Sequence, residues 1–268
     1  MATAIRMSGL AHAAKSTASG WDLLVAVTMR DLRVRYQGTF FSYIWWIARP
    51  LALGLVLYFA LGQVLRVGVP NYPVFLIAGL FPWFWFSSSI AQAADTFTGN
   101  SGMIKKVKFP RLILPLSAVF FNTAQFLMTL PIIAIFVYVA GGTELDIAWL
   151  AGIPILMAVQ LAVLIGLGTL LASLNVFLRD IGPILEVVLL LMFYMTGIIF
   201  PIDRVPEKYQ WVMDLNPIAP LIEAWRNLFI AGELPDTGLW PTVLLAVVAV
   251  GLGLAVFHRL EKHFGDAL

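Results

Sequence analysis

Cysteine is absent from this 268-residue chain. The chain therefore cannot form disulfides, thiolate metal sites or cysteine nucleophiles. The three histidines, His12, His258 and His263, all lie in the terminal segments, which argues against a buried metal site. Charge is also scarce, because Asp, Glu, Lys and Arg make up only 12% of the residues. The net charge of +2 is too small to indicate a nucleic-acid partner.

Apolar residues are correspondingly abundant, at 60% of the chain, and the mean hydropathy is +0.90. A soluble domain is about 45–50% apolar and about 25% charged. A chain of this length cannot hide so much apolar surface in a core of its own, so a lipid bilayer must cover it. The sequence predicts an all-α polytopic membrane protein, built as a single transmembrane domain over residues 21–268.

Long apolar runs place about six spans, each near the roughly 20 residues that cross a bilayer as a helix. Residues 1–20 are small, polar and free of acids, and we expect a disordered leader there, with an organelle presequence as the alternative. The expected spans are Ile44–Leu65, Val74–Ala94, Leu112–Ala140, Ile147–Leu174, Ile184–Phe200 and Leu239–Phe257.

Residues 21–37 carry apolar side chains at helical spacing, with charged residues on the other side. This pattern predicts an N-terminal amphipathic helix that lies in the membrane interface. Arg30, Arg33 and Arg35 would then lie at headgroup depth, where they could either anchor the helix to anionic lipid or contact a diphosphate.

The distribution of positive charge sets the orientation. Most of the 17 lysines and arginines fall in segments that alternating spans place on one side. By the positive-inside rule this side is the cytoplasm, and both chain termini lie on it. Four basic residues remain for the outer side, namely Arg66, Arg204, Lys208 and Arg226.

The outer segment 201–236 holds two apolar stretches, Pro206–Leu215 and about Ala219–Ile230, separated by Asn216-Pro217. Each stretch is too short to cross a bilayer. Apolar stretches of about 10–14 residues beside spans indicate a re-entrant helical hairpin, and an ordinary folded loop is the alternative.

In the second stretch an apolar stripe faces a polar one, and Glu223 and Arg226 are expected to pair on the polar stripe. Two such hairpins around a dimer axis could cover a pore. We therefore expect the segment to be an outer gate, with Trp211, Glu223, Trp225 and Arg226 as its main residues.

The sequence offers little catalytic chemistry. No phosphate-binding loop is present, because the nearest string, Gly9–Ser16, has Ala14 where the second glycine belongs. No span carries a charge at its middle, which disfavours a proton-coupled or sodium-coupled carrier. The chain is therefore not expected to be an enzyme. A membrane glycosyltransferase stays open, because Glu144/Asp146 and Glu233/Asp236 form acid pairs by spacing.

Aromatic residues are plentiful instead. Tyr58 and Phe59 in the first span and Phe193 and Tyr194 in the fifth could stack on sugar rings along a pore. Packing between helices would use the same side chains, so both interpretations remain.

Five short motifs follow one another along the chain from residue 21 to its end. They are Leu32–Tyr36 before Trp45-Trp46, Leu80–Trp83 with Phe86–Ser89, Lys105–Arg111, Asn175–Asp180, and Asn216-Pro217 followed by Trp225-Arg226. In their order and spacing the chain resembles the membrane subunit of type-2 ABC exporters that carry polysaccharides, the O-antigen and capsule permeases.

The resemblance implies a homodimer in the bacterial inner (plasma) membrane, bound to two separate ATPase subunits. It implies a continuous channel for a polysaccharide on an undecaprenyl diphosphate carrier. ATP and magnesium would be bound by the ATPase, so this chain would need no cofactor. The loop Lys108–Arg111 is similar to the O-antigen type, which favours O-antigen over capsule or teichoic acid. An exporter of drugs or lipids of the same class is the next alternative.

Contact with the ATPase is expected at the basic inner loop between the second and third spans and at the turn after the fourth. A basic cluster is also a topology signal, and this alternative stays open for the lysines. The residues concerned are Lys105, Lys106, Lys108, Arg111, Arg179 and Asp180.

Overall fold

The structure is a computed structural model and describes residues 23–29, 42–106, 109–141 and 146–267. These residues form helices and connecting turns without a strand, as the sequence predicts. Of the predicted interfacial helix, residues 23–29 are described, and they are helical. Leu24 and Val27 pack there against Ile113. The predicted leader, Arg30, Arg33, Arg35, Lys108 and Glu144 lie outside the described residues.

Among the described residues, five helical segments are long and apolar enough to cross a bilayer. Their bounds agree closely with five of the predicted runs. They are α3 (Ser42–Leu57) with the π-helix η1 (Tyr58–Val64), α4 (Tyr72–Ala94), α7 (Ile113–Phe136) with the π-helix η2 (Val137–Gly141), α8 (Ala148–Asn175) and α12 (Trp240–Leu260).

The predicted fifth span is shorter than expected. The helix at this place, α9 (Ile181–Met195), has 15 residues, which extend about 22 Å at 1.5 Å per residue. The hydrocarbon core of a bilayer is about 30 Å thick. α9 ends early because Gly197 adopts a left-handed conformation, with φ at +68°, which glycine tolerates and which interrupts a helix. The count of six spans therefore stays a prediction.

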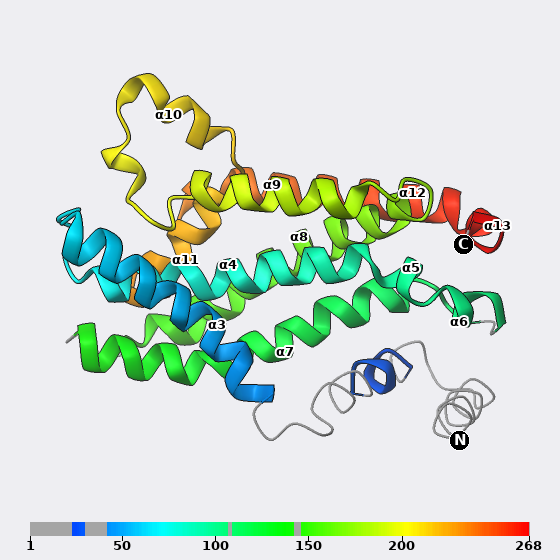
Figure 1. The fold of residues 1–268 in the computed structure, drawn as a ribbon, viewed down its shortest axis with the longest axis horizontal. Helices are drawn as coiled ribbons and strands as arrows, with labels where there is room; N and C mark the ends of the chain where they lie inside the picture. The colour runs from blue at the N-terminus through cyan, green and yellow to red at the C-terminus, as the bar shows by residue number, and fades with distance from the viewer. Residues whose placement is uncertain (1–22, 30–41, 107–108, 142–145, 268) are drawn as a thin grey trace.

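The predicted inner and outer segments lie at opposite ends of one elongated bundle (Figure 1). One end carries α5 (Thr96–Gly99), α6 (Ser101–Lys106) and α13 (Phe264–Ala267); we call it the α6 end. A separate apolar cluster, which includes Phe97, Ile104 and Phe264, joins these short helices to α7, α8 and α12.

α4 is the centre of the bundle, because most of its side chains are buried and it packs against α3, α7, α8 and α9. Its Trp85 stacks on Phe126 of α7, with ring centroids 4.5 Å apart. Such aromatic pairs contribute about 0.5–1.5 kcal/mol beyond the area they bury. The middle of α4 is thereby fixed against α7.

Glycines let α8 and α12 touch backbone to backbone. A Cβ at Gly253 would lie 2.4 Å from the carbonyl oxygen of Gly166, and a Cβ at Gly166 would lie 2.4 Å from the backbone nitrogen of Val250. Small residues at such crossings allow close van der Waals packing in lipid, where no hydrophobic force pulls helices together. α8 and α12 therefore form one closely packed pair.

The end opposite α6 carries α10 (Glu207–Asp214) and α11 (Ala219–Ala231), whose bounds match the two predicted short helices. We call this the α11 end. The two helices differ in their surroundings. α11 packs against α4 and α8 with Trp225 buried, whereas α10 projects from the bundle (Figure 1) and leaves Trp211 60% exposed. The re-entrant course of the segment stays a prediction.

Candidate functional site

One face of α4 stays open although the rest of the helix is buried. Its partly exposed side chains recur every three or four residues, from Phe84 through Ser88 and Ala91 to Asp95 just after the helix. This period keeps them on a single side of an α-helix. The open stripe is polar toward the α6 end, where the residues are Ser87, Ser88, Gln92 and Asp95.

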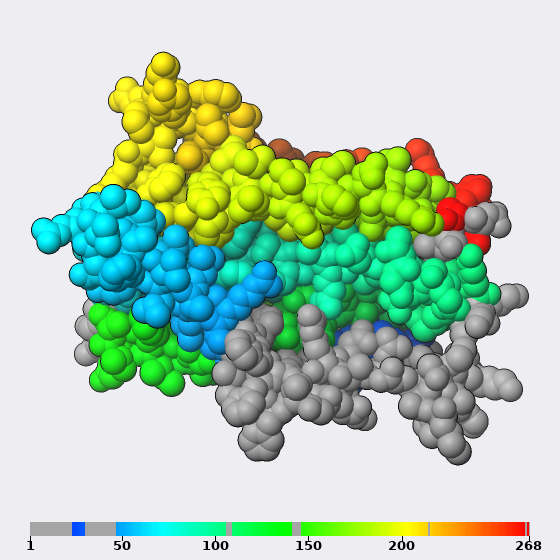
Figure 2. Space-filling view, viewed as in Figure 1, coloured from blue at the N-terminus to red at the C-terminus, as the bar shows by residue number. Residues whose placement is uncertain are grey.

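Three adjoining cavities share Asp95 on this stripe. The largest, about 540 Å³, lies between α4 and α9 and reaches Arg179 and Glu186. A second, about 310 Å³, lies beside α3 and reaches Arg49. The third, about 260 Å³, lies against α7. We call the surface formed by the first two cavities the α4 groove. Figure 2 shows α9 as a yellow-green band across this face, with α4 in teal beside it.

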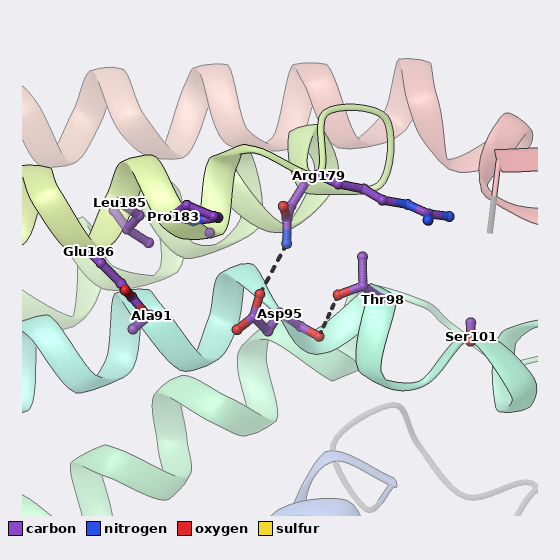
Figure 3. Close-up of a pocket in the computed structure, with 10 residues that line it drawn as sticks. Ala91, Asp95, Thr98, Ser101, Arg179, Pro183, Leu185 and Glu186 are labelled. Atoms are coloured by element: carbon purple, nitrogen blue, oxygen red, sulfur yellow. Dashed lines mark hydrogen bonds between the residues drawn. The ribbon is translucent and has the colours of Figure 1, made fainter.

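The lining of the α4 groove is mixed in charge. It offers carboxylates at Asp95 and Glu186, guanidinium groups at Arg49 and Arg179, and several hydroxyl and amide groups. Figure 3 shows Arg179 extended away from Asp95 toward the α5 and α6 end of the cavity. Among the described residues no group of three or more acids and histidines could hold a metal ion. Such a surface can donate and accept hydrogen bonds, as a hydroxyl-rich ligand requires.

Asn175, the last residue of α8, joins two parts of this site. Its side-chain amide donates to the backbone carbonyl of Ala94 at 3.0 Å and to the carboxylate of Asp95 at 3.1 Å. The dashed line to the Asp95 carboxylate in Figure 3 marks the second of these bonds. Asp95 lies at the break between α4 and α5. One amide therefore connects the segment that leads to α6 with the turn that carries Arg179 and Asp180.

The residues predicted to contact an ATPase are only partly brought together. Lys105 is exposed on α6, and Lys106 ends that helix. Arg111 donates instead to the backbone carbonyl of Glu261, with its guanidinium 5.9 Å from the ring centroid of Phe264. Arg179 and Asp180 are exposed in the turn between α8 and α9, and Arg179 also lines the α4 groove.

The predicted aromatic channel residues occupy two separate helices toward the α11 end. The hydroxyl of Tyr58 accepts a hydrogen bond from Gln63 at 2.6 Å, while Phe59 is exposed. On α9, Phe193 packs against Trp83 with ring centroids 6.0 Å apart, and Tyr194 is exposed. Phe193 thus takes part in helix packing, and the exposed rings remain available to a ligand.

The structure separates the residues predicted for an outer gate. Trp211 is exposed on α10, whereas Trp225 is fully buried on α11. The prediction that Arg226 lies with Glu223 on a polar stripe is wrong, because Arg226 is only 8% exposed and Glu223 faces outward. α11 is enclosed by two helices, α4 and α8, so its buried arc is wider than a single stripe. Burial lowers the pKa of Arg226 to about 10, against the opposing charge of Glu223.

A buried amide that the sequence analysis did not single out holds α11 in place. Gln160 of α8 accepts the indole N–H of Trp225 at 2.8 Å and donates to the carbonyl of Pro82 in α4 at 3.0 Å. The sequence feature that could have indicated this residue is that Gln160 is an amide within an otherwise apolar stretch of α8. An amide in a span must find partners inside the protein.

Comparison with known proteins gives consistent matches. Residues 22–230 match the family described as "ABC-2 type transporter". Two proteins named O-antigen export system permease protein RfbA, both of Klebsiella pneumoniae, are 38% and 40% identical to this chain, over 92% of it and 95% of their own length. The polysialic acid transport protein KpsM of Escherichia coli is 23% identical, over 88% of this chain and 93% of its own.

Proposed function

This chain belongs to the ABC-2 type transporter family, and we propose from that membership that it is the membrane-spanning permease of an ATP-driven polysaccharide exporter, with O-antigen as the polysaccharide. The observation that carries the proposal is the identity of 38–40% to two O-antigen export permeases, against 23% to the polysialic acid transport protein KpsM. The substrate proposed is a polysaccharide on an undecaprenyl diphosphate carrier.

The proposal assigns ATP hydrolysis to a separate ATPase subunit, which would also bind the magnesium. The sequence supports this, since no phosphate-binding loop occurs in it. The ATPase would dock at the α6 end, where Lys105 and Asp180 are exposed. Asn175 supports a route for movement from this end, because it joins the start of the α5 and α6 segment to the end of α8, from which the chain turns into α9.

The α6 end faces the cytoplasm in this proposal, and both chain termini lie on that side of the bacterial inner membrane. The charge distribution supports this orientation, because lysines and arginines concentrate in the segments of the α6 end. Export would run from the α6 end toward the α11 end.

Two copies would enclose the path. The α4 groove is open on one side, and the helices beside it carry exposed apolar side chains, such as Leu55 of α3 and Val187, Leu190 and Leu191 of α9. A second copy that covers these faces would turn two grooves into one channel. The hydroxyl, amide and carboxylate groups of the groove suit the hydroxyl groups of a glycan.

The test is export by defined components. The chain and the ATPase that co-purifies with it are reconstituted in vesicles, and ATP-dependent movement of lipid-linked O-antigen to the far side is measured. In cells, deletion should remove O-antigen from the surface, and the wild-type gene should restore it. If only capsule polysaccharide is moved, the proposed substrate, O-antigen, is wrong. Sugar transfer by the purified chain without an ATPase would contradict the proposal.

A further inference from the structure

One arginine, Arg226, is buried inside the helical bundle at the α11 end. Arg226 of α11 points into the bundle, with its guanidinium carbon 3.7 Å from the ring centroid of Phe75 on α4. Its Nη2 donates to the carbonyl of Gly197 at 2.8 Å. Its Nε is buried without a hydrogen-bond partner. Within the described chain no acidic side chain forms an ion pair with this guanidinium.

The carbonyl that Arg226 binds belongs to Gly197, two residues past the end of α9. Helix carbonyls at a C-terminus lack partners within the helix and form the negative end of its dipole, so a cation is favoured there. Gly197 follows the last residues of α9 in a left-handed conformation. Arg226 therefore satisfies a carbonyl at the point where α9 turns away.

Two further side chains hold the same turn, residues 196–200. The hydroxyl of Tyr72 at the start of α4 donates to the carbonyl of Ile199 at 2.8 Å. The amide of Asn216, just before α11, donates to the hydroxyl of Thr196 at 2.8 Å. The turn is thus bound to α4 through Tyr72, to α11 through Arg226, and to Asn216 just before α11. α9 itself packs mainly along α4 and α8.

The energetics distinguish a positioning role from simple packing. Removing a cation from water is costly, and an apolar side chain at a buried charged position is often as stable or more stable. A site that needed only packing would be served by leucine or methionine. The directional hydrogen bond and the stacking on Phe75 instead fix where the turn lies relative to α11.

We propose that Arg226 is a positioning residue that locks the outer turn of α9, residues 196–200, to α11, so that α9 and α11 move as one body when the export path opens and closes. This inference rests on the proposed function, because α9 borders the α4 groove. In this role Arg226 joins α9, which forms one wall of the α4 groove, to the buried helix α11.

The test measures exposure of the turn, which does not depend on the substrate. The chain lacks cysteine, so Ile198→Cys gives a single thiol at a fully buried position. In the complex with its ATPase, Arg226→Met should raise the rate of labelling by a membrane-impermeant maleimide about tenfold or more, since the opening equilibrium changes tenfold for each 1.4 kcal/mol of lost interaction. Asn227→Gln, on the exposed side of α11, is the matched control and should label like the parent.

Thermal stability separates positioning from folding. Arg226→Met should keep a melting temperature within about 4 °C of the parent while cells lose export or leak small solutes. Arg226→Lys, which keeps a cation and a donor, should restore slow labelling in part. Unchanged labelling and normal export in a folded Arg226→Met protein would overturn the proposal.

A second variant keeps the proposal testable if Arg226→Met does not fold. A Cβ at Gly79 would lie 3.1 Å from Nη2 of Arg226, so Gly79→Ala should displace the guanidinium without removing it and should speed labelling. If Gly79→Ala labels like the parent while Arg226→Met fails to fold, Arg226 serves folding alone. If the parent protein itself exports no polysaccharide and Arg226→Met still labels faster, the lock is upheld and the proposed function is rejected.

Discussion

The indole N–H of Trp225 donates to the side-chain oxygen of Gln160 at 2.8 Å, which ties α11 to the middle of α8. Because the same amide also donates to the carbonyl of Pro82, one side chain joins three helices. α11 is therefore a fixed part of the bundle, and any movement at this end must carry α11 with it or break this contact.

Replacement of Gln160 should show how strongly that contact holds α11. Gln160→Leu leaves the buried indole N–H without a partner, which should cost about 1–3 kcal/mol of stability. Thermal unfolding in detergent measures the loss. Trp225→Phe removes the same hydrogen bond, so the double variant should lose less than the sum of the two single variants. Strictly additive losses would show that the hydrogen bond contributes nothing.

Exchanging Asn175 and Asp95 tests whether their hydrogen bond links α8 to α5. Asn175→Asp places a carboxylate within hydrogen-bond distance of Asp95 and removes the donor, so export should fall about tenfold, the equivalent of one lost hydrogen bond. Asp95→Asn in the same chain supplies a donor again and should recover part of the export. Asn227→Asp, an exposed amide of α11, is the control. No recovery in the double variant would refute the link.

Charge reversal separates motor contact from folding at the α6 end. Lys105→Glu, Lys106→Glu and Lys108→Glu together should weaken binding of the ATPase several-fold, because each exposed pair contributes about 0–1 kcal/mol. Arg111→Glu should instead lower thermal stability, because Arg111 binds the carbonyl of Glu261 and lies over Phe264. Pull-down and melting experiments distinguish the two effects. Normal binding and export by the triple variant would mean that the lysines only set topology.

The glycine contact between α8 and α12 gives a matched pair of variants. Gly253→Ala places a Cβ 2.4 Å from the carbonyl of Gly166, and overpacking of this kind costs about 1–3 kcal/mol. Gly251→Ala meets nothing within 4 Å and should be neutral or slightly stabilising, since alanine favours a helix. Equal melting temperatures for both variants would show that the helices adjust without cost.

Orientation can be read with single cysteines, because the chain has none. A cysteine at Gly102 of α6 should be protected from an impermeant reagent in spheroplasts, and one at Glu233 after α11 should react. Both positions are exposed in the structure, so protection would reflect the side of the membrane. Labelling of Gly102 from outside would overturn the proposed orientation.

The helix positions could be predicted because each depends on local features of the chain. The lengths of the apolar runs fixed the long helices, and Asn216-Pro217 marked the start of α11. α9 differs because a single left-handed residue, Gly197, ended it. Glycine in an apolar run does not by itself predict such a break.

The candidate site was less predictable, because it depends on contacts between distant segments. Arg226 was expected to pair with Glu223 on the polar stripe of its helix, since a charge is rarely fully buried, but α11 is enclosed by α4 and α8. Asn175 was noticed only as the first residue of the motif Asn175–Asp180, and Gln160 carries no charge, so neither side chain was expected to bind its partner. Their partners, Asp95 and Trp225, lie 80 and 65 residues away in the chain.

The projection of α10 has a consequence for how this protein responds to its lipid. Tyr209 and Trp211 are exposed on α10, with the ammonium of Lys208 5.5 Å from the ring centroid of Tyr209. Aromatic and basic side chains of this kind settle at the headgroup layer, so we expect the lipid surface to set the height of α10. The short α9, which ends at the turn held by Arg226, lies on the chain just before α10. We therefore expect a change in acyl-chain length or lateral tension to pull on that turn, so that bilayer thickness would be a mechanical input to the exporter.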